Sequence, residues 1–174
     1  MHWRLKAYLA FFYICFFASR VLSHEISIDG KLDDPAWISA DEYTKYYESL
    51  PFTLNEPKDF QKVLILEDEK GIYLGFINKQ DKETIRANRH ERDDEMANAD
   101  KAGLAIDFDG DGLAAYAFTV SAGGSIADGI YRNENEVNYD WDADWKSGVF
   151  IDQDYWYAEM FIPVSYTHLT LPTM

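Results

Sequence analysis

Cysteine is almost absent from this 174-residue chain: the single one, Cys15, lies in an apolar run close to the first residue. If that run is removed during export, as argued next, the remaining domain has no cysteine and cannot form a disulfide. A domain without disulfides has to be stabilised by a buried core, alone or together with a bound metal.

Long hydrophobic runs are also missing, apart from residues 7–18. This run is shorter than the roughly 20 apolar residues that a membrane-spanning helix needs. Arg4 and Lys6 precede it, and short side chains end at Ser23, which is the order of a secretory signal peptide. We therefore predict cleavage after Ser23 and export to the periplasm, the cell envelope or the extracellular space. An uncleaved anchor is the alternative, but Arg20 interrupts the apolar stretch.

Basic residues are few, since 16 Lys and Arg stand against 31 Asp and Glu, for a net charge of −15. A surplus of negative charge repels nucleic acid and anionic membrane surfaces. We expect no nucleic-acid partner, and membrane contact only through a region beyond the end of this sequence. The charge suits neutral ligands and cations such as calcium.

Short stretches in which apolar and polar residues alternate dominate the rest of the chain, separated by clusters of Gly, Asp and Asn. The seven clearest are 60–66, 72–77, 102–108, 114–120, 125–131, 145–151 and 156–162. We predict one all-β domain over residues 24–164, an antiparallel β-sandwich of the immunoglobulin or jelly-roll kind. Residues 81–100 break the alternation and predict a long loop with room for a helical turn.

The end of the chain, residues 165–174, does not continue the strand pattern. It resembles the peptide produced when sequencing-adapter DNA is translated. We therefore expect these ten residues to be non-native, and the natural protein to continue beyond Val164, so that the sandwich is truncated at its C-terminal side. A natural polar tail is the alternative.

Catalytic patterns are lacking as well: there is no Ser-His-Asp order, no zinc-ligand spacing and no glycine-rich phosphate loop. Glycoside hydrolysis needs two carboxylates fixed about 5 to 10 Å apart across a cleft. An isolated sandwich of this length predicts no deep cleft. We expect the chain itself not to be an enzyme.

Four sequence blocks together resemble family 9 carbohydrate-binding modules. They are IDGKLDDPAW (28–37), GIYLGF (71–76), the stretch 92–107 with its RD, D and ID positions, and WYAEMFIP (156–163). They occur in the order found in that family. The resemblance implies a β-sandwich that binds oligo- or polysaccharides without catalysis, in support of polysaccharide degradation.

The WDADW stretch at 141–145 most resembles a subgroup of that family. Its members place the module at the N-terminus of an exported bacterial protein that continues into a predicted outer-membrane β-barrel. In other members the module is attached to secreted glycoside hydrolases. The alternative function is a structural or interaction domain of an outer-membrane protein that does not bind sugar.

Candidate ligand contacts lie mainly in residues 131–145, where aromatic rings alternate with polar groups. Sugar rings stack on aromatic faces, while carboxylates, amides and arginines bind their hydroxyls. The predicted contacts are Tyr131, Tyr139, Trp141 and Trp145, and the resemblance adds Arg92 and Asp93. The alternatives are that the tryptophans cap the edge of the sandwich and that Arg92 and Asp93 form an ion pair between loop and sheet.

The resemblance also implies that two tryptophans grip the terminal sugar, and residues 42–80 contain none. A tyrosine of that region would have to replace the first of them.

Two other groups are candidate ligands for metals. Asp107, Asp109 and Asp111 have the D-x-D-x-D-G spacing of a calcium loop, although position twelve is Phe118 and an EF-hand is excluded. An acidic hairpin turn is the alternative. Haem binding is a third functional hypothesis, with Met96, His90 or Met160 as axial ligand.

Two core positions are predicted from the pattern. Trp37 is large enough to fill one end of a sandwich. Residues 156–162 alternate so that Trp156 and Met160 share one face and Glu159 lies on the other. Glu159, between aromatics, is predicted to be half-buried and paired with an arginine of the long loop.

Overall fold

The computed structural model describes residues 25–49, 51–94, 97–132 and 136–163. These residues form nine strands and two short 3-10 helices, and no α-helix. The elements are η1 (Pro35–Ser39), β1 (Asp41–Tyr43), β2 (Gln61–Asp68), β3 (Gly71–Lys79), η2 (Lys82–Thr84), β4 (Lys101–Ile106), β5 (Ala114–Ser121), β6 (Ile126–Arg132), β7 (Glu136–Asn138), β8 (Lys146–Ile151) and β9 (Tyr155–Pro163).

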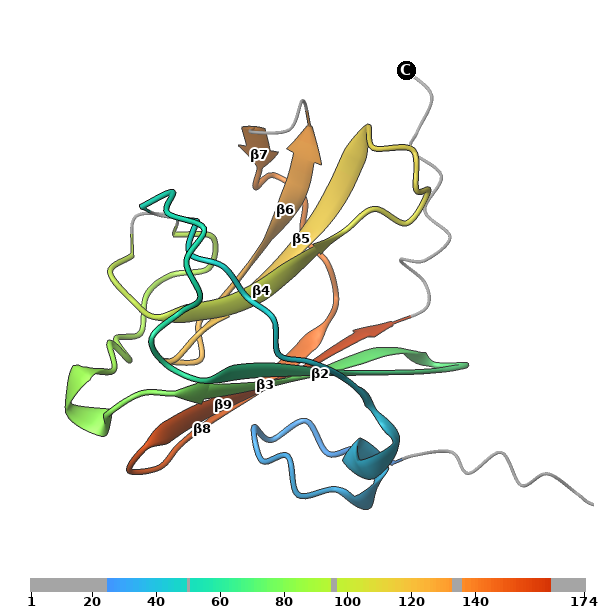
Figure 1. Ribbon diagram of the computed structural model, residues 1–174. Coiled ribbons are helices and arrows are strands. Elements are labelled where there is room, and N and C mark those ends of the chain that lie inside the picture. The colour runs from blue at the N-terminus through green and yellow to red at the C-terminus, as the bar shows by residue number, and fades with distance from the viewer. Residues whose placement is uncertain (1–24, 50, 95–96, 133–135, 164–174) are drawn as a thin grey trace, which may run out of the picture.

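The strands form two sheets, one of five strands in the order β1-β2-β3-β9-β8 and one of four in the order β4-β5-β6-β7. Every pairing is antiparallel. The sheets lie one above the other in Figure 1. The predicted all-β antiparallel sandwich is confirmed, and all seven predicted strands are present.

The main core lies between the sheets. On β9, the alternation predicted from the sequence turns Trp156, Ala158, Met160 and Ile162 toward the four-stranded sheet, and all four are buried. Phe118 of β5 meets them from the other side and is fully buried. Apolar side chains at every second position thus supply one face of each sheet to a common core.

A second, smaller core lies on the other face of the five-stranded sheet. Residues 25–40 run beneath this sheet, on the side away from the four-stranded one (Figure 1). Their Trp37 is buried against Leu64, Leu66 and Tyr73. The predicted core position of Trp37 is confirmed, and its partners are the outward side chains of β2 and β3.

Glu159 holds this N-terminal segment in place. Its side chain is fully buried, and its carboxylate accepts hydrogen bonds from the backbone N–H groups of Asp29 (2.9 Å) and Gly30 (2.8 Å) and from the Trp37 indole (3.0 Å). The prediction that an arginine of the long loop pairs with Glu159 is therefore wrong. Burial raises the pKa of the Glu159 carboxyl, although these three donors act in the opposite direction.

Gly30 is required at the point where the segment crosses β8. Its φ is +89°, a left-handed conformation that favours glycine. A Cβ atom there would lie 2.4 Å from the carbonyl carbon of Val149. The absence of a side chain therefore lets the segment approach β8 closely enough to reach Glu159.

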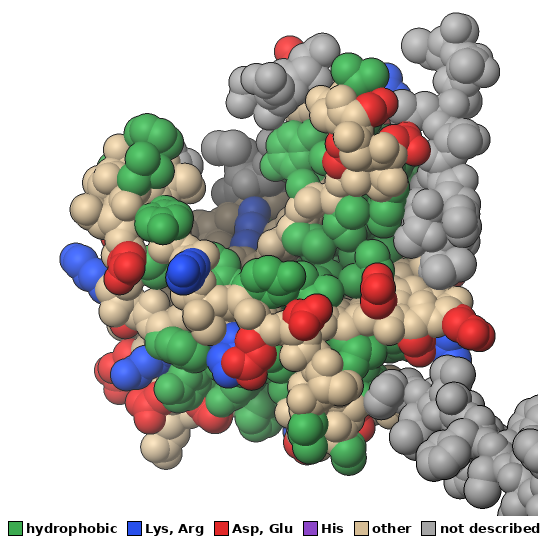
Figure 2. Space-filling view, turned by 45° about the vertical axis from the view of Figure 1, so that its right-hand side comes forward, with side chains coloured by type: hydrophobic (Ala, Val, Ile, Leu, Met, Phe, Trp, Pro, Cys, Tyr) green, Lys and Arg blue, Asp and Glu red, His purple; other side chains and the backbone are tan. Residues whose placement is uncertain are grey.

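The surface carries acidic side chains at scattered points, and hydrophobic side chains gather on the upper layer in Figure 2. Within the described ranges, no helix has the length and apolar character needed to cross a membrane.

Candidate functional site

The residues predicted from the sequence to bind ligand lie on different faces of the four-stranded sheet. On β6, Asp128 and Ile130 are buried, whereas Tyr131 points to the opposite, outer face. Trp141 and Trp145 follow β7 in the segment that crosses to the five-stranded sheet, and they pack on the inner side. The predicted residues therefore do not form one surface.

The two tryptophans belong to the core side of the sheet. Trp145 is only 6% exposed and meets Phe118 edge-on, with ring centroids 5.6 Å apart. Trp141 is half-buried and contacts Tyr116 edge-on at 5.0 Å. Trp145 therefore has no free ring face for a sugar. Tyr139, just before them, is half-buried, and its role in binding stays a prediction, as does that of Trp141.

Arg92 and Asp93 connect the long loop to the sheet. The Arg92 guanidinium pairs with the buried carboxylate of Asp128, and its Nε lies 2.9 Å from Asp142 and 3.5 Å from Asp93. The backbone N–H of Asp128 in turn donates to Asp93 (2.9 Å). These contacts agree with the alternative that Arg92 and Asp93 form an ion pair between the loop and the sheet.

Asp128 is the centre of this network. It is 1% exposed, and burial raises the pKa of its carboxyl against the lowering effects of the Ala143 N–H and the Arg92 guanidinium. Ala143 both donates to Asp128 and accepts from Arg92 (3.2 Å). One buried carboxylate thus fixes the long loop and the crossing segment to β6.

The long loop itself is built as the sequence predicted. It contains the short helix η2, which confirms the expected helical turn. Its two ends are joined where the backbone and guanidinium of Arg86 bond the carboxylate of Asp100. Although burial acts to raise it, these bonds lower the pKa of Asp100 overall.

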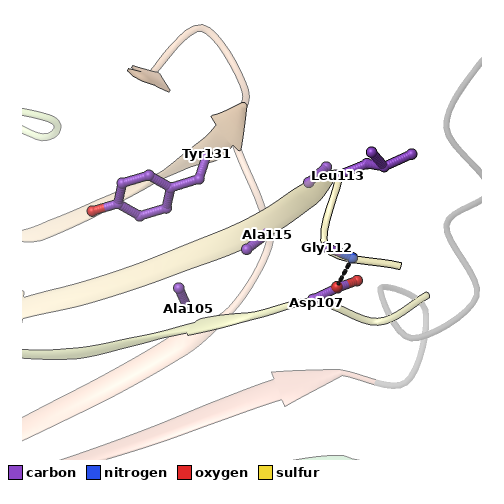
Figure 3. A pocket seen from close by; sticks show the side chains of 7 residues that line it. Ala105, Asp107, Gly112, Leu113, Ala115 and Tyr131 are labelled. Atoms are coloured by element: carbon purple, nitrogen blue, oxygen red, sulfur yellow. Dashed lines mark hydrogen bonds between the residues drawn. The ribbon is translucent and has the colours of Figure 1, made fainter. Parts of the chain in front are cut away.

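Tyr131 lies instead at a shallow hollow on the outer face of the four-stranded sheet (Figure 3). The hollow has a volume of about 320 Å³ and is lined by Ala105, Asp107, Gly112, Leu113, Ala114, Ala115 and Tyr131. Ala115 is the direct cross-strand partner of Tyr131. Small side chains on β4 and β5 therefore leave the ring of Tyr131 standing over a low, mostly apolar floor.

Asp107, one of the predicted calcium ligands, lies at the end of this hollow. Its carboxylate accepts from the backbone N–H groups of Asp109 (3.1 Å), Gly110 (2.8 Å) and Gly112 (2.7 Å), the last drawn in Figure 3. The Gly112 N–H is the largest of the effects that lower the pKa of Asp107. The arrangement is that of an acidic hairpin turn.

No three His, Cys, Asp or Glu side chains in the described part of the chain are grouped to hold a metal ion. Asp109 and Asp111 are exposed, and the Asp107 carboxylate faces the turn backbone. Calcium at this loop stays a prediction.

The candidate haem ligands are not brought together among the described residues. Met160 is fully buried between the sheets. His90 is half-buried, and its Nδ1 lies 2.9 Å from the carbonyl oxygen of Glu91. Met96 lies outside the described residues.

Comparison with known proteins bears on the fold. A protein from Bacteroides uniformis, provisionally named as carbohydrate-binding, superposes with a TM-score of 0.57 at 14% identity. A family 9 carbohydrate-binding module from Caldicellulosiruptor kristjanssonii, solved with cellotriose, gives 0.57 at 11% identity. The chain has the same fold as these two proteins. The matches cover 76% and 79% of this chain but 65% and 63% of theirs. No protein-family model and no curated protein matches the sequence.

The lining of the outer hollow was missed from the sequence, apart from Tyr131 and Asp107. A signal for it exists, because Ala105 on β4 and Ala115 on β5 occupy outward positions where exposed strands usually carry larger polar residues. Small residues on the outward positions of neighbouring strands predict an open sheet face.

Proposed function

We propose that this chain binds carbohydrate, without catalysis, on the outer face of its four-stranded sheet. The observation that carries the proposal is the hollow beneath Tyr131, which combines one aromatic ring with a floor of methyl groups. The likeness of the fold to a module solved with cellotriose supports the choice of ligand class.

The chemistry of the hollow suits a sugar ring. The C–H face of a pyranose stacks on the phenol ring of Tyr131, and the phenol hydroxyl serves as a hydrogen-bonding group. Asp107 lines the end of the hollow, where its carboxylate accepts hydrogen bonds from backbone N–H groups of the turn. Neutral ligands also suit a chain with a net charge of −15.

The wider setting belongs to the same proposal. The leader-like residues 1–23 support export, and the sequence resemblance supports a module at the start of a larger envelope protein or glycoside hydrolase. Mass spectrometry of the secreted protein tests the first point, since cleavage after Ser23 leaves His24 as the first residue.

A second candidate function is a structural or interaction domain without sugar binding. The position of Trp145 in the core favours it, because a ring that is 6% exposed offers no face to a sugar. Arg92 is already engaged with Asp128 and Asp142. The two candidates differ in whether any glycan binds.

Titration with cellotriose, xylotriose and laminaritriose, followed by isothermal calorimetry, tests the proposal. The full chain is compared with Tyr131→Ala and with Tyr43→Ala, a matched control whose ring is exposed on β1 of the other sheet. We expect Tyr131→Ala to weaken binding and the control to leave it unchanged. Equal binding by all three proteins would remove the hollow as the site, and no binding to any glycan would favour the interaction domain.

A further inference from the structure

Three aromatic rings form a row on the outer face of the five-stranded sheet, at the hairpin of β8 and β9. Phe150 and Tyr157 are direct cross-strand partners, with ring centroids 6.2 Å apart and an interplanar angle of 32°. Tyr157 stacks with Tyr155 at 5.9 Å and 26°. The three rings thus follow one another at regular spacing, with interplanar angles of 26° and 32°. We call these three residues the aromatic row.

The hairpin turn fixes the row. Asp152 accepts hydrogen bonds from the backbone N–H groups of Asp154 (3.0 Å) and Tyr155 (2.8 Å). Its second oxygen accepts from the hydroxyl of Tyr157 (3.3 Å). Because the turn and the central ring share one carboxylate, the rings are held in position before any ligand arrives, which lowers the entropic cost of binding.

The row borders a hollow of about 360 Å³ that lies between the hairpin and the N-terminal segment. Leu32 and Ile77 contribute apolar surface, and Lys31, Asp33 and Asp152 contribute charge of both signs. The ammonium group of Lys31 lies 5.8 Å from the ring centroid of Phe150. Phe150 is 39% exposed, so part of its ring is open to solvent.

This combination selects one kind of ligand. Donors and acceptors of opposite charge beside flat rings suit a neutral, polyhydroxylated molecule, whose hydroxyls use both kinds of group while its C–H faces stack. An apolar protein segment would leave the charges of Lys31, Asp33 and Asp152 without water, which costs free energy. A polyanion would meet the negative charge of the chain as a whole.

We propose that the aromatic row is a second carbohydrate-contacting site, which takes an extended neutral glycan along its three rings. The inference rests on the proposed function, but it uses the opposite sheet of the sandwich from Tyr131. Two sites on opposite faces allow one molecule to join two separate glycan strands.

The test uses the full chain and cellotriose, xylotriose or laminaritriose in isothermal calorimetry, with binding to insoluble cellulose as a second measurement. Four proteins are compared: wild type, Phe150→Leu, Tyr131→Ala and the double variant. Leucine keeps an apolar side chain for packing but removes the ring face, and Phe150→Tyr restores a ring. We expect two sites in the wild type, one in each single variant, none in the double variant, and recovery with Phe150→Tyr.

Thermal unfolding separates binding from structure, since cross-strand aromatic pairs also stabilise hairpins. A Phe150→Leu protein with an unchanged melting temperature, and with one calorimetric site where the wild type has two, supports the proposal. One site in the wild type and full binding by Phe150→Leu would overturn it, while leaving the Tyr131 hollow intact. Loss in Phe150→Leu alone, with Tyr131→Ala unaffected, supports the row and overturns the Tyr131 hollow. No binding to any of the glycans would overturn both.

Discussion

Replacing Glu159 by glutamine tests how the N-terminal segment is held. The substitution preserves the size and shape of the side chain but supplies one acceptor oxygen where the carboxylate supplies two. That oxygen can serve the N–H groups of Asp29 and Gly30, as Oε2 does now. The amide nitrogen then faces the indole N–H of Trp37, and two donors confront each other.

The expected change in the free energy of unfolding follows from these contacts. A buried donor without a partner costs about 1–3 kcal/mol, and each hydrogen bond that loses a charged acceptor weakens by about 1 kcal/mol. Removal of a buried charge offsets part of this loss, as the raised pKa of Glu159 indicates. We expect Glu159→Gln to lower the free energy of unfolding by about 2 kcal/mol.

Urea unfolding at neutral pH measures the change, and Glu42→Gln is the control. Glu42 makes an exposed salt bridge with Lys62 (2.9 Å), which is worth about 1 kcal/mol or less. Trypsin gives a local readout, because cleavage after Lys31 requires the segment to leave the sheet, and we expect it to be faster in Glu159→Gln. A loss below about 0.5 kcal/mol, with unchanged cleavage, would refute the view that Glu159 anchors the segment.

The same carboxyl predicts a dependence on pH. Its pKa is raised in the folded state, so its contribution to stability is fully present below the pKa of the unfolded chain. That contribution is lost as the pH rises through the folded pKa. Relative to Glu159→Gln, the wild type is therefore expected to gain stability when the pH is lowered toward the ordinary pKa of glutamate, which paired urea titrations measure.

Three further perturbations have defined outcomes. Arg92→Ala leaves the Asp128 carboxylate buried without its cation, and we expect a loss of about 2–3 kcal/mol in urea unfolding, less than for a fully buried pair because Arg92 is 37% exposed. The loss is expected to be smaller at acidic pH, where Asp128 is protonated; a loss independent of pH would contradict the assigned role. Phe118→Ala removes a fully buried ring from between the sheets, and about 3–5 kcal/mol is expected from the same measurement, with less than 1 kcal/mol counting against its central place in the core. The lowered pKa of Asp107 gives stability that is present above the ordinary pKa of aspartate and is lost on acidification, so Asp107→Ala is expected to lower the melting temperature at neutral pH and not near pH 2. A calcium-dependent rise in the melting temperature of the wild type, absent from Asp107→Ala, would support calcium at that loop.

The strands that bury one face could be predicted from the sequence, because the alternation of apolar residues indicates which side chains point inward. β1 and β7 were not, since each has only three residues and no buried side chain. Such short strands exist because a neighbouring strand offers them hydrogen-bond partners, and that information is absent from their own residues.

The partners of individual side chains were harder to predict. Periodicity placed Glu159 opposite Trp156 and Met160, but it could not tell that residues 29 and 30, at the other end of the chain, would supply its donors. The aromatic segment 139–145 suggested an exposed ligand face because its polar residues alternate with rings. Its path between the sheets instead turns Trp145 inward against Phe118.

The bond between Gly30 and Glu159 spans 129 residues, which has a consequence for the order of events during synthesis. The segment that leaves the ribosome among the first can reach its final place only after β9, the last strand described, has emerged. Contacts of such long sequence separation make folding slow, because a large loop must close before they form. The beginning of this domain is therefore expected to remain accessible to chaperones and proteases until nearly the whole of it has been made.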